Sequence, residues 1–271
     1  MLAFHGVPDL ERFEQLLDEV LLDYIPVSSE DVRRALVGEG ALPRFPVWFT
    51  FDDGVPSTFH AGRALAERGI QATAFVCPAV LDTHQYLWFQ AWERCREVGL
   101  LDGTDDRERF ALARLKSLPD EERRAETAAL LARLVSAGVQ PPPQADQAML
   151  QAWVRQGHDL GNHTWDHPML DQCSPEEQRE QVISAHRDLE ARGFAPRFLA
   201  YPNGNGSQAA ADAAAGLGYA GSLLFDHRLT DVAGDRHRLS RLRLDSDAGP
   251  RRAASVASGA HSAAMHLVPR L

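Results

Sequence analysis

The chain has 271 residues, of which 44% are hydrophobic and 24% charged, so it can form a sizeable core and is too apolar for a disordered protein. Its formal net charge of −10 excludes a positive field that would hold nucleic acid or an anionic membrane. Three cysteines without a CxxC pair exclude a disulfide framework and an all-cysteine zinc site. The first residues lack an export signal and no long apolar run follows, so we expect a soluble, cytoplasmic protein with no membrane partner.

Short apolar runs alternate with longer helical patterns, which is typical of α/β architecture. We expect about seven strands, at residues 2–6, 46–51, 70–77, 158–162, 197–201, 218–225 and 238–244. Helical patterns cover residues 8–22, begin again at Ser29, and cover 57–68 and 145–156. A parallel strand–helix barrel and an open doubly wound sheet both fit this order, and both place ligand chemistry in loops at the carboxyl ends of strands.

Residues 84–147 differ from the rest, because Ala, Leu, Glu and Arg recur there at helical spacing and no strand pattern is present. We interpret them as a helical insertion within a single domain formed by residues 1–271. Trp88 and Trp92 lie four residues apart near its start, a spacing that suits either a sugar-stacking wall or core packing. The only lysine, Lys116, also falls here and is a poor candidate for Schiff-base or phosphate-loop chemistry.

The first polar cluster follows the expected strand at 46–51. Asp52 and Asp53 are adjacent, so on a regular strand their side chains would point to opposite faces. Gly54 and Pro56 supply residues that bend the backbone. The pair is therefore either a catalytic carboxylate pair or the start of a plain turn.

The second cluster follows the expected strand at 158–162. His163 and His167 lie four residues apart, a spacing that brings two imidazoles to one face of a helical turn. Pro168 prevents a long helix, and no glutamate follows the first histidine, so this is not the helical HExxH zinc pattern. The pair is either a metal-binding pair or a surface coincidence.

The third cluster begins with Arg197 and ends in Pro202-Asn203-Gly204. An arginine that enters a buried strand usually pairs with a carboxylate. The end of the cluster also fits a plain turn. Taken together, one aspartate and two histidines form the three-ligand set of a catalytic zinc site, and the second aspartate is then free to act as a base.

These three clusters resemble, in order, the motifs of the polysaccharide deacetylase family, also called the NodB-homology domain or carbohydrate esterase family four. Residues 49–54 are similar to its TFDDG motif, residues 163–168 to its H-[ST]-x-x-H-P motif, and residues 197–202 to its R-x-x-x-x-P motif. The resemblance covers about residues 46–245 apart from the helical insertion. It implies an irregular (β/α)7 TIM-like barrel and metal-dependent removal of N- or O-linked acetyl groups from a carbohydrate.

The resemblance also implies roles for individual residues. Asp53, His163 and His167 would bind the metal, Asp52 would be the general base that activates water, and Arg197 would orient Asp52. The segment at Pro202 and Asn203 would contact the substrate and help to stabilise the oxyanion, with Trp88 as a further wall. Zinc is the expected metal, and Co²⁺, Ni²⁺ and Fe²⁺ accept similar ligands.

One family motif is missing, because no leucine-x-x-histidine supplies a general acid in residues 238–247. His5, His237, His261 and His266 are the candidates to replace it. The missing acid leaves two alternatives open, a cyclic imide or ureide hydrolase on the same barrel and a carbohydrate-binding relative with impaired catalysis. The sequence does not specify the acetylated substrate or the oligomeric state.

Overall fold

The computed structural model describes residues 1–101 and 105–261, without the side chains of residues 105–110. Seven parallel strands form the main sheet, in the order β8-β7-β6-β5-β4-β1-β9. Their bounds are β1 (Leu2–Phe4), β4 (Phe49–Phe51), β5 (Thr73–Val76), β6 (Asp159–Asn162), β7 (Phe198–Ala200), β8 (Gly221–Leu223) and β9 (Leu242–Arg243). Two further strands, β2 (Ile25–Pro26) and β3 (Pro46–Val47), pair in a small sheet of their own. The predicted α/β barrel of seven strands is thus confirmed.

The two ends of the main sheet approach each other through the segment before β9. Leu239 bridges Leu223 of β8 in parallel, and Leu242 in the same segment pairs with Leu2 of β1. Residues 239–243 therefore connect both edges, so that the sheet curls into an irregular barrel.

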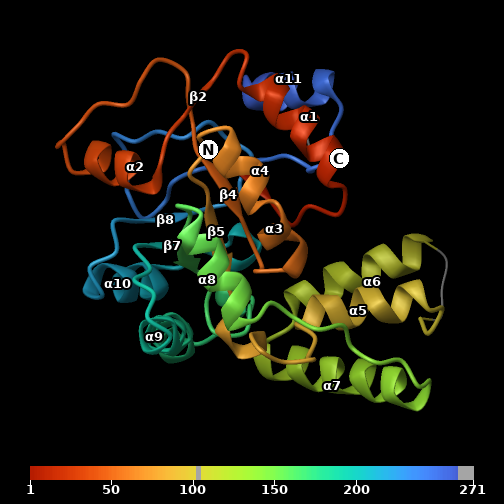
Figure 1. Cartoon of the computed structure of the whole chain (residues 1–271). Helices are drawn as coiled ribbons and strands as arrows, with labels where there is room; N and C mark the ends of the chain where they lie inside the picture. Colours follow the sequence, from red (N-terminus) through yellow and green to blue (C-terminus); the bar gives the residue numbers. More distant parts are fainter. Residues whose placement is uncertain (102–104, 262–271) are drawn as a thin grey trace.

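Helices surround the sheet (Figure 1). They are α1 (Leu10–Val20), α2 (Ser29–Leu36), α3 (Pro56–His60), α4 (Gly62–Glu67), α5 (Trp88–Glu97), α6 (Asp105–Ser117), α7 (Asp120–Ser136), α8 (Gln147–Arg155), α9 (Pro175–Ala191), α10 (Gln208–Gly216) and α11 (Pro250–Ala257). The predicted helix at 57–68 is divided at Ala61 into α3 and α4. Its neighbour Gly62 packs so closely against Trp153 and Gln156 that a Cβ would lie 2.1 Å from the Gln156 Oε1 atom.

Alternate residues of the strands face two separate cores, as the period of two requires. Phe49 and Phe51 pack outward with residues of the surrounding helices in the largest apolar cluster. Trp48, Phe75 and Phe198 pack with one another on the inner side of the barrel. The inward register of the chain at β4 is therefore 48, 50 and 52, which directs Asp52 toward the barrel interior.

The segment predicted as a helical insertion forms α5, α6 and α7, which lie as a group at the lower right of Figure 1. Their apolar residues pack around a cluster of their own that includes Trp88, Trp92 and Leu134. Met169, from the loop after β6, belongs to the same cluster. The insertion is thus packed directly against the loop after β6 that carries His163 and His167.

Candidate active site

Asp52 and Asp53 follow β4, where the backbone turns sharply. Asp53 has φ of 71° and Gly54 has φ of 67°, both in the left-handed region. A Cβ on Gly54 would lie 2.9 Å from the Val76 side chain, so this position requires glycine for space as well as for conformation. The bend allows two adjacent carboxylates to reach the same cavity, as predicted, and left-handed non-glycine residues of this kind concentrate at functional sites.

Asp52 forms a buried ion pair with Arg241, a residue that the sequence analysis did not select. Arg241 Nη1 donates to Asp52 Oδ1 and Nη2 to Oδ2, both at 2.7 Å. The Arg241 side chain is 0% exposed and that of Asp52 4%. Burial raises the pKa of Asp52, but Arg241 and His163 oppose that effect and hold the pKa below its ordinary value. Asp52 is thus an ionised carboxylate with fixed orientation.

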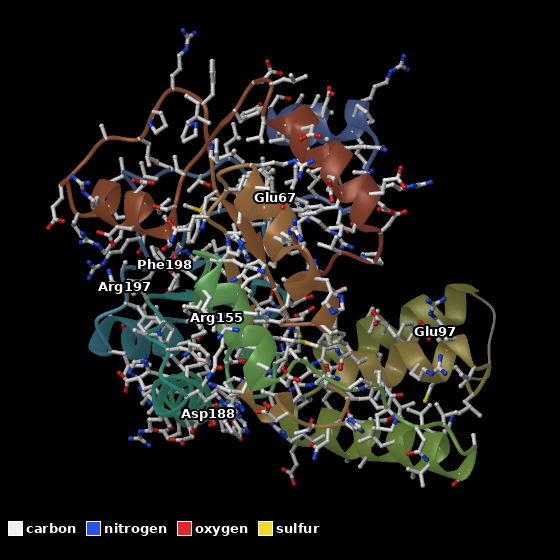
Figure 2. All side chains as sticks on the ribbon, viewed as in Figure 1. Glu67, Glu97, Arg155, Asp188, Arg197 and Phe198 are labelled. Carbon is white, nitrogen blue, oxygen red and sulfur yellow. The ribbon has the colours of Figure 1, made fainter. Side chains whose placement is uncertain are left out.

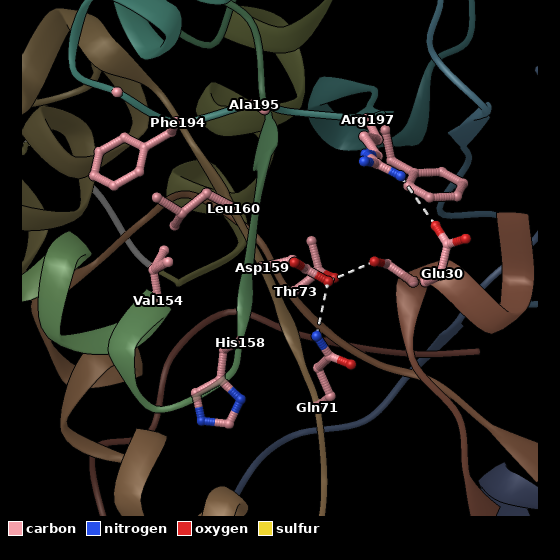
Figure 3. A pocket seen from close by; sticks show the side chains of 13 residues that line it. Glu30, Gln71, Thr73, Val154, His158, Asp159, Leu160, Phe194, Ala195 and Arg197 are labelled. Atoms are coloured by element: carbon pink, nitrogen blue, oxygen red, sulfur yellow. Dashed lines mark hydrogen bonds and ion pairs between the residues drawn. The ribbon is translucent and has the colours of Figure 1, made fainter.

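The prediction that Arg197 orients Asp52 is wrong. Figure 3 shows the Arg197 guanidinium directed at Glu30, with Nη1 3.0 Å from Oε2, at a separate cavity of about 490 Å³. Arg197 precedes the first residue of β7 whereas Asp52 follows the last residue of β4, so the two residues lie at opposite ends of a parallel barrel. Figure 2 likewise shows Arg197 on the opposite side of the molecule from Glu97, which belongs to helix α5 of the insertion.

The three predicted metal ligands converge on one point. His163 Nε2 and His167 Nε2 each lie 3.3 Å from Asp53 Oδ1, and one ligand atom from each of the three residues lies within 4.8 Å of the others. The His163 Nδ1–H group donates to the Ala200 carbonyl oxygen at 2.8 Å, which leaves the Nε2 lone pair free for a metal. The predicted triad is therefore brought together by the fold.

The donor set fits a divalent cation. Asp53 Oδ1 is buried and makes no hydrogen bond to any described residue, although two imidazole nitrogens face it. Burial raises the pKa of Asp53, but the two imidazoles hold it well below its ordinary value. A buried carboxylate oxygen between two imidazole nitrogens is satisfied by a bound cation, and two histidines with one carboxylate suit zinc and similar transition metals.

Side chains around the ligands hold the loop after β6 in shape. Asn162 Oδ1 accepts from the Thr164 backbone N–H at 2.7 Å, and Gln181 of α9 accepts from the backbone N–H groups of Trp165 and Asp166. His167 has φ of 61°, a strained conformation for this residue. These hydrogen bonds oppose relaxation of the loop, so the imidazoles are placed before a metal binds.

Trp88 supports the same loop from the helical insertion. Its Nε1–H group donates to the His167 carbonyl oxygen at 2.8 Å, and the ring of its neighbour Phe89 lies 4.8 Å from the His167 ring. Trp88 is 8% exposed, so little of its indole face is open to a sugar. The structure therefore supports a positioning role for Trp88 rather than the predicted stacking wall.

The ligands open into a cavity of about 380 Å³. It is lined by Asp52, Asp53, His163 and His167 together with His5, Val55, Trp88, Phe89, Gln90, Glu93, Leu112, Lys116, Asn203, Gly204, Phe225 and Arg243. Asn203, with φ of 55°, lies on this wall as predicted for a substrate contact, whereas Pro202 is buried and does not line the cavity. Six of the lining residues, from Trp88 to Lys116, belong to the insertion, of which the sequence analysis had selected only Trp88 for the site.

The four candidate general acids differ in whether they line this cavity. His5 follows β1, lines the cavity, and packs edge-on against Phe225 with ring centroids 5.0 Å apart. His237 Nδ1 instead pairs with the Ser222 hydroxyl at 2.9 Å, outside this cavity. His261 follows α11 and does not line the cavity, and His266 lies outside the described residues. Among the described histidines, His5 is thus the candidate acid at the site.

The sequence rule that pointed to Arg197 as the partner of a carboxylate applies equally to Arg241. Arg241 stands between the buried residues Leu239 and Leu242 in the last strand segment. The rule that an arginine in a buried strand pairs with a carboxylate applies to it. The Asp52 partner could be chosen only from the closed barrel, because Arg241 is 189 residues away in the chain.

The comparisons with known proteins agree with this site. The sequence model of the polysaccharide deacetylase family matches residues 39–222. A peptidoglycan-N-acetylglucosamine deacetylase of Bacillus cereus is 40% identical over 52 residues, 19% of either chain. A chitooligosaccharide deacetylase of Bradyrhizobium is 34% identical over 73 residues, 26% of this chain and 33% of that protein. The matches thus span only a fifth to a third of these curated relatives.

Solved structures support the fold. A Streptococcus pyogenes deacetylase, PplD, in complex with acetate has a TM-score of 0.63 at 18% identity, with 94% of this chain and 95% of that one covered.

Among the described residues, no helix is long and apolar enough to cross a membrane. The match to the family model over most of the barrel, together with the convergent Asp–His–His set, shows that this chain belongs to the polysaccharide deacetylase family.

Proposed function

We propose that this chain is a metal-dependent deacetylase that hydrolyses N- or O-linked acetyl groups on a carbohydrate. The observation that carries the proposal is the convergence of Asp53, His163 and His167 beside a second carboxylate, Asp52, that a buried arginine holds in place. The names of the curated relatives support an N-acetylated sugar as the substrate. We further propose that the barrel and the insertion at 84–147 act as one catalytic domain, since both line the cavity.

Asp53, His163 and His167 would hold the cation, with zinc the first choice and Co²⁺, Ni²⁺ or Fe²⁺ as alternatives. Such a cation lowers the pKa of water and polarises a carbonyl group. The residues of the chain itself supply the general base, the general acid and the contact to the oxyanion.

Asp52 is the proposed general base. Its two oxygen atoms face Arg241, and each keeps a lone pair that can accept the proton of the attacking water. As the water oxygen bonds to the acetyl carbon, Asp52 takes its proton, and the adjacent Arg241 stops Asp52 from turning away. A positioned base of this kind contributes roughly 10²–10⁴-fold to the rate.

The leaving amine or alcohol needs a proton, and we assign its donor as His5. The imidazole lines the cavity together with both aspartates. The left-handed turn at Asn203 lies on another wall, where a backbone N–H group can donate to the oxyanion. His5, directly after the first strand, would thus take the role of the family's missing histidine.

The test compares Asp52→Asn with Asp53→Asn. Asp52→Asn should retain stoichiometric metal by elemental analysis and lose roughly 10²–10⁴-fold in acetate release from N-acetylated chito-oligosaccharides. Asp53→Asn should lose metal and activity together, because one of three ligands is gone. Wild-type protein that takes up no Zn²⁺, Co²⁺, Ni²⁺ or Fe²⁺ on reconstitution would contradict the proposal. Ring opening of hydantoin or succinimide without acetate release from any sugar would instead favour the cyclic imide hydrolase.

A further inference from the structure

Lys116, the only lysine of the chain, lies in the active-site cavity although it belongs to the helical insertion. It stands in the last turn of α6, and its Nζ donates to Asn203 Oδ1 at 2.7 Å across 87 residues of sequence. The ammonium group is half-buried and shares the cavity wall with the three metal ligands. Its position is therefore set by the site and not by the surface of the insertion.

The hydrogen bond of Lys116 goes to a neutral amide, and no ion pair of Lys116 is found among the described residues. Arg241 is fully paired with Asp52, whereas Arg243, the other cation that lines the cavity, is half exposed and contacts the partly exposed Asp245 through Nε only, at 3.2 Å. Burial and the charge of Arg243 lower the pKa of Lys116, while the carboxylates of Glu93 and Asp53 partly offset this effect. A half-buried ammonium group whose N–H groups are not all hydrogen-bonded to protein can donate a charge-assisted hydrogen bond to an anionic ligand.

We propose that Lys116, together with Arg243, binds an anionic substituent of the acetylated sugar, a carboxylate or a phosphate, and so selects negatively charged substrates. This inference rests on the proposed deacetylase function and names its substrate class. The incoming anion accepts from the N–H groups of Lys116 that Asn203 leaves free, and Arg243 lines the same cavity. A charge-assisted hydrogen bond contributes about 1.5–3 kcal/mol, which is a factor of roughly 10–100 in kcat/KM.

The test uses three sugars that differ in charge: N-acetylglucosamine, its 6-phosphate, and N-acetylmuramic acid, which carries a carboxylate. Wild-type enzyme should prefer at least one charged sugar by roughly tenfold or more, and the phosphate and carboxylate arms identify which anion is bound. Lys116→Met should remove that preference, because kcat/KM for the charged sugar falls by more than kcat/KM for the neutral sugar, mainly through KM, while Lys116→Arg should retain the preference. Arg114→Met is the matched control, because Arg114 lies on the same helix, pairs with Glu126, and does not line the cavity.

Equal kcat/KM for all three sugars in the wild type would overturn the inference. An equal loss on neutral and charged sugars in Lys116→Met would also overturn it, since Lys116 would then act only through Asn203. Binding is measured separately by amine-selective labelling of the lysine, mapped by mass spectrometry. Protection of Lys116 by charged but not neutral sugar supports the inference even if no acetate is released, so a failure of the proposed activity can be told apart from a failure of this assignment.

Discussion

The ion pair between Arg241 and Asp52 makes the sharpest prediction, because the chain offers a matched control. Arg241→Met removes a guanidinium that is 0% exposed and leaves a buried carboxylate without its cation. Breaking a buried pair in this way costs about 3–5 kcal/mol of unfolding free energy. At about 2–4 °C per kcal/mol for a chain of this size, the melting temperature should fall by roughly 6–20 °C.

Arg197→Met removes an arginine from the position that the sequence motif had selected. Its partner Glu30 is half exposed, and the Arg197 side chain is 60% exposed. Exposed ion pairs contribute about 0–1 kcal/mol to the free energy of unfolding, so this variant should melt close to the wild type and retain its pH–rate profile. Both variants remove one guanidinium, so the comparison separates the loss of a buried partner from the loss of a positive charge.

The pH dependence gives a second readout of the same pair. In the wild type the pKa of Asp52 is below its ordinary value of 3.8, so the pair stabilises the fold above that pH, and the contribution is lost as the pH falls through the folded-state pKa. In Arg241→Met burial is no longer opposed by the guanidinium, and the pKa of Asp52 rises. The stability deficit of the variant should therefore shrink on acidification, and the acidic limb of its rate profile should move to higher pH.

Adding Asp52→Asn to Arg241→Met should recover part of the lost stability, because the double variant no longer buries an unpaired charge. Chemical denaturation at pH 7 and pH 4, together with acetate-release rates, measures all four proteins. The reasoning is refuted if Arg241→Met melts like the wild type, or if Arg197→Met shifts the acidic limb as far as Arg241→Met does.

Three further predictions concern the metal and the acid. Trp88→Phe should lower metal affinity by roughly 10–100-fold in a chelator competition, because the Nε1–H bond to the His167 carbonyl is lost; unchanged affinity would remove Trp88 from the site. His5→Gln should lower acetate release by roughly 10²–10⁴-fold without loss of metal, whereas unchanged release would point to another acid. Chelation should lower the melting temperature of the wild type but not of Asp53→Asn, measured by calorimetry, and equal shifts would place the metal elsewhere.

The insertion changes how the site is understood. In sequence it resembles an addition to the barrel, with its own apolar helices. In the structure Trp88 supports a metal ligand and Lys116 reaches the wall at Asn203. Deleting the insertion would therefore remove part of the active site and not only a peripheral subdomain.

Local sequence determined the parts of the site that depend on neighbouring residues. The period of two along β4 directs Asp52 inward with Trp48 and Thr50. The left-handed turn at Asp53 and Gly54 then directs the Asp53 carboxylate into the same cavity. The sequence also predicted that His163 and His167 lie together, but the helical turn expected from their spacing is absent, and left-handed residues at Thr164 and His167 shape the loop instead. Proximity of this kind could be predicted because backbone geometry relates residues a few positions apart.

Tertiary structure alone decided which distant groups meet. Closure of the barrel brings Arg241 to Asp52 across 189 residues, and packing of the insertion brings Lys116 to Asn203 across 87. It also selects His5 among the candidate acids, because β1 pairs directly with β4. A sequence pattern indicates that a buried arginine needs a carboxylate, but the choice of carboxylate depends on strand order and barrel closure, which no local pattern contains.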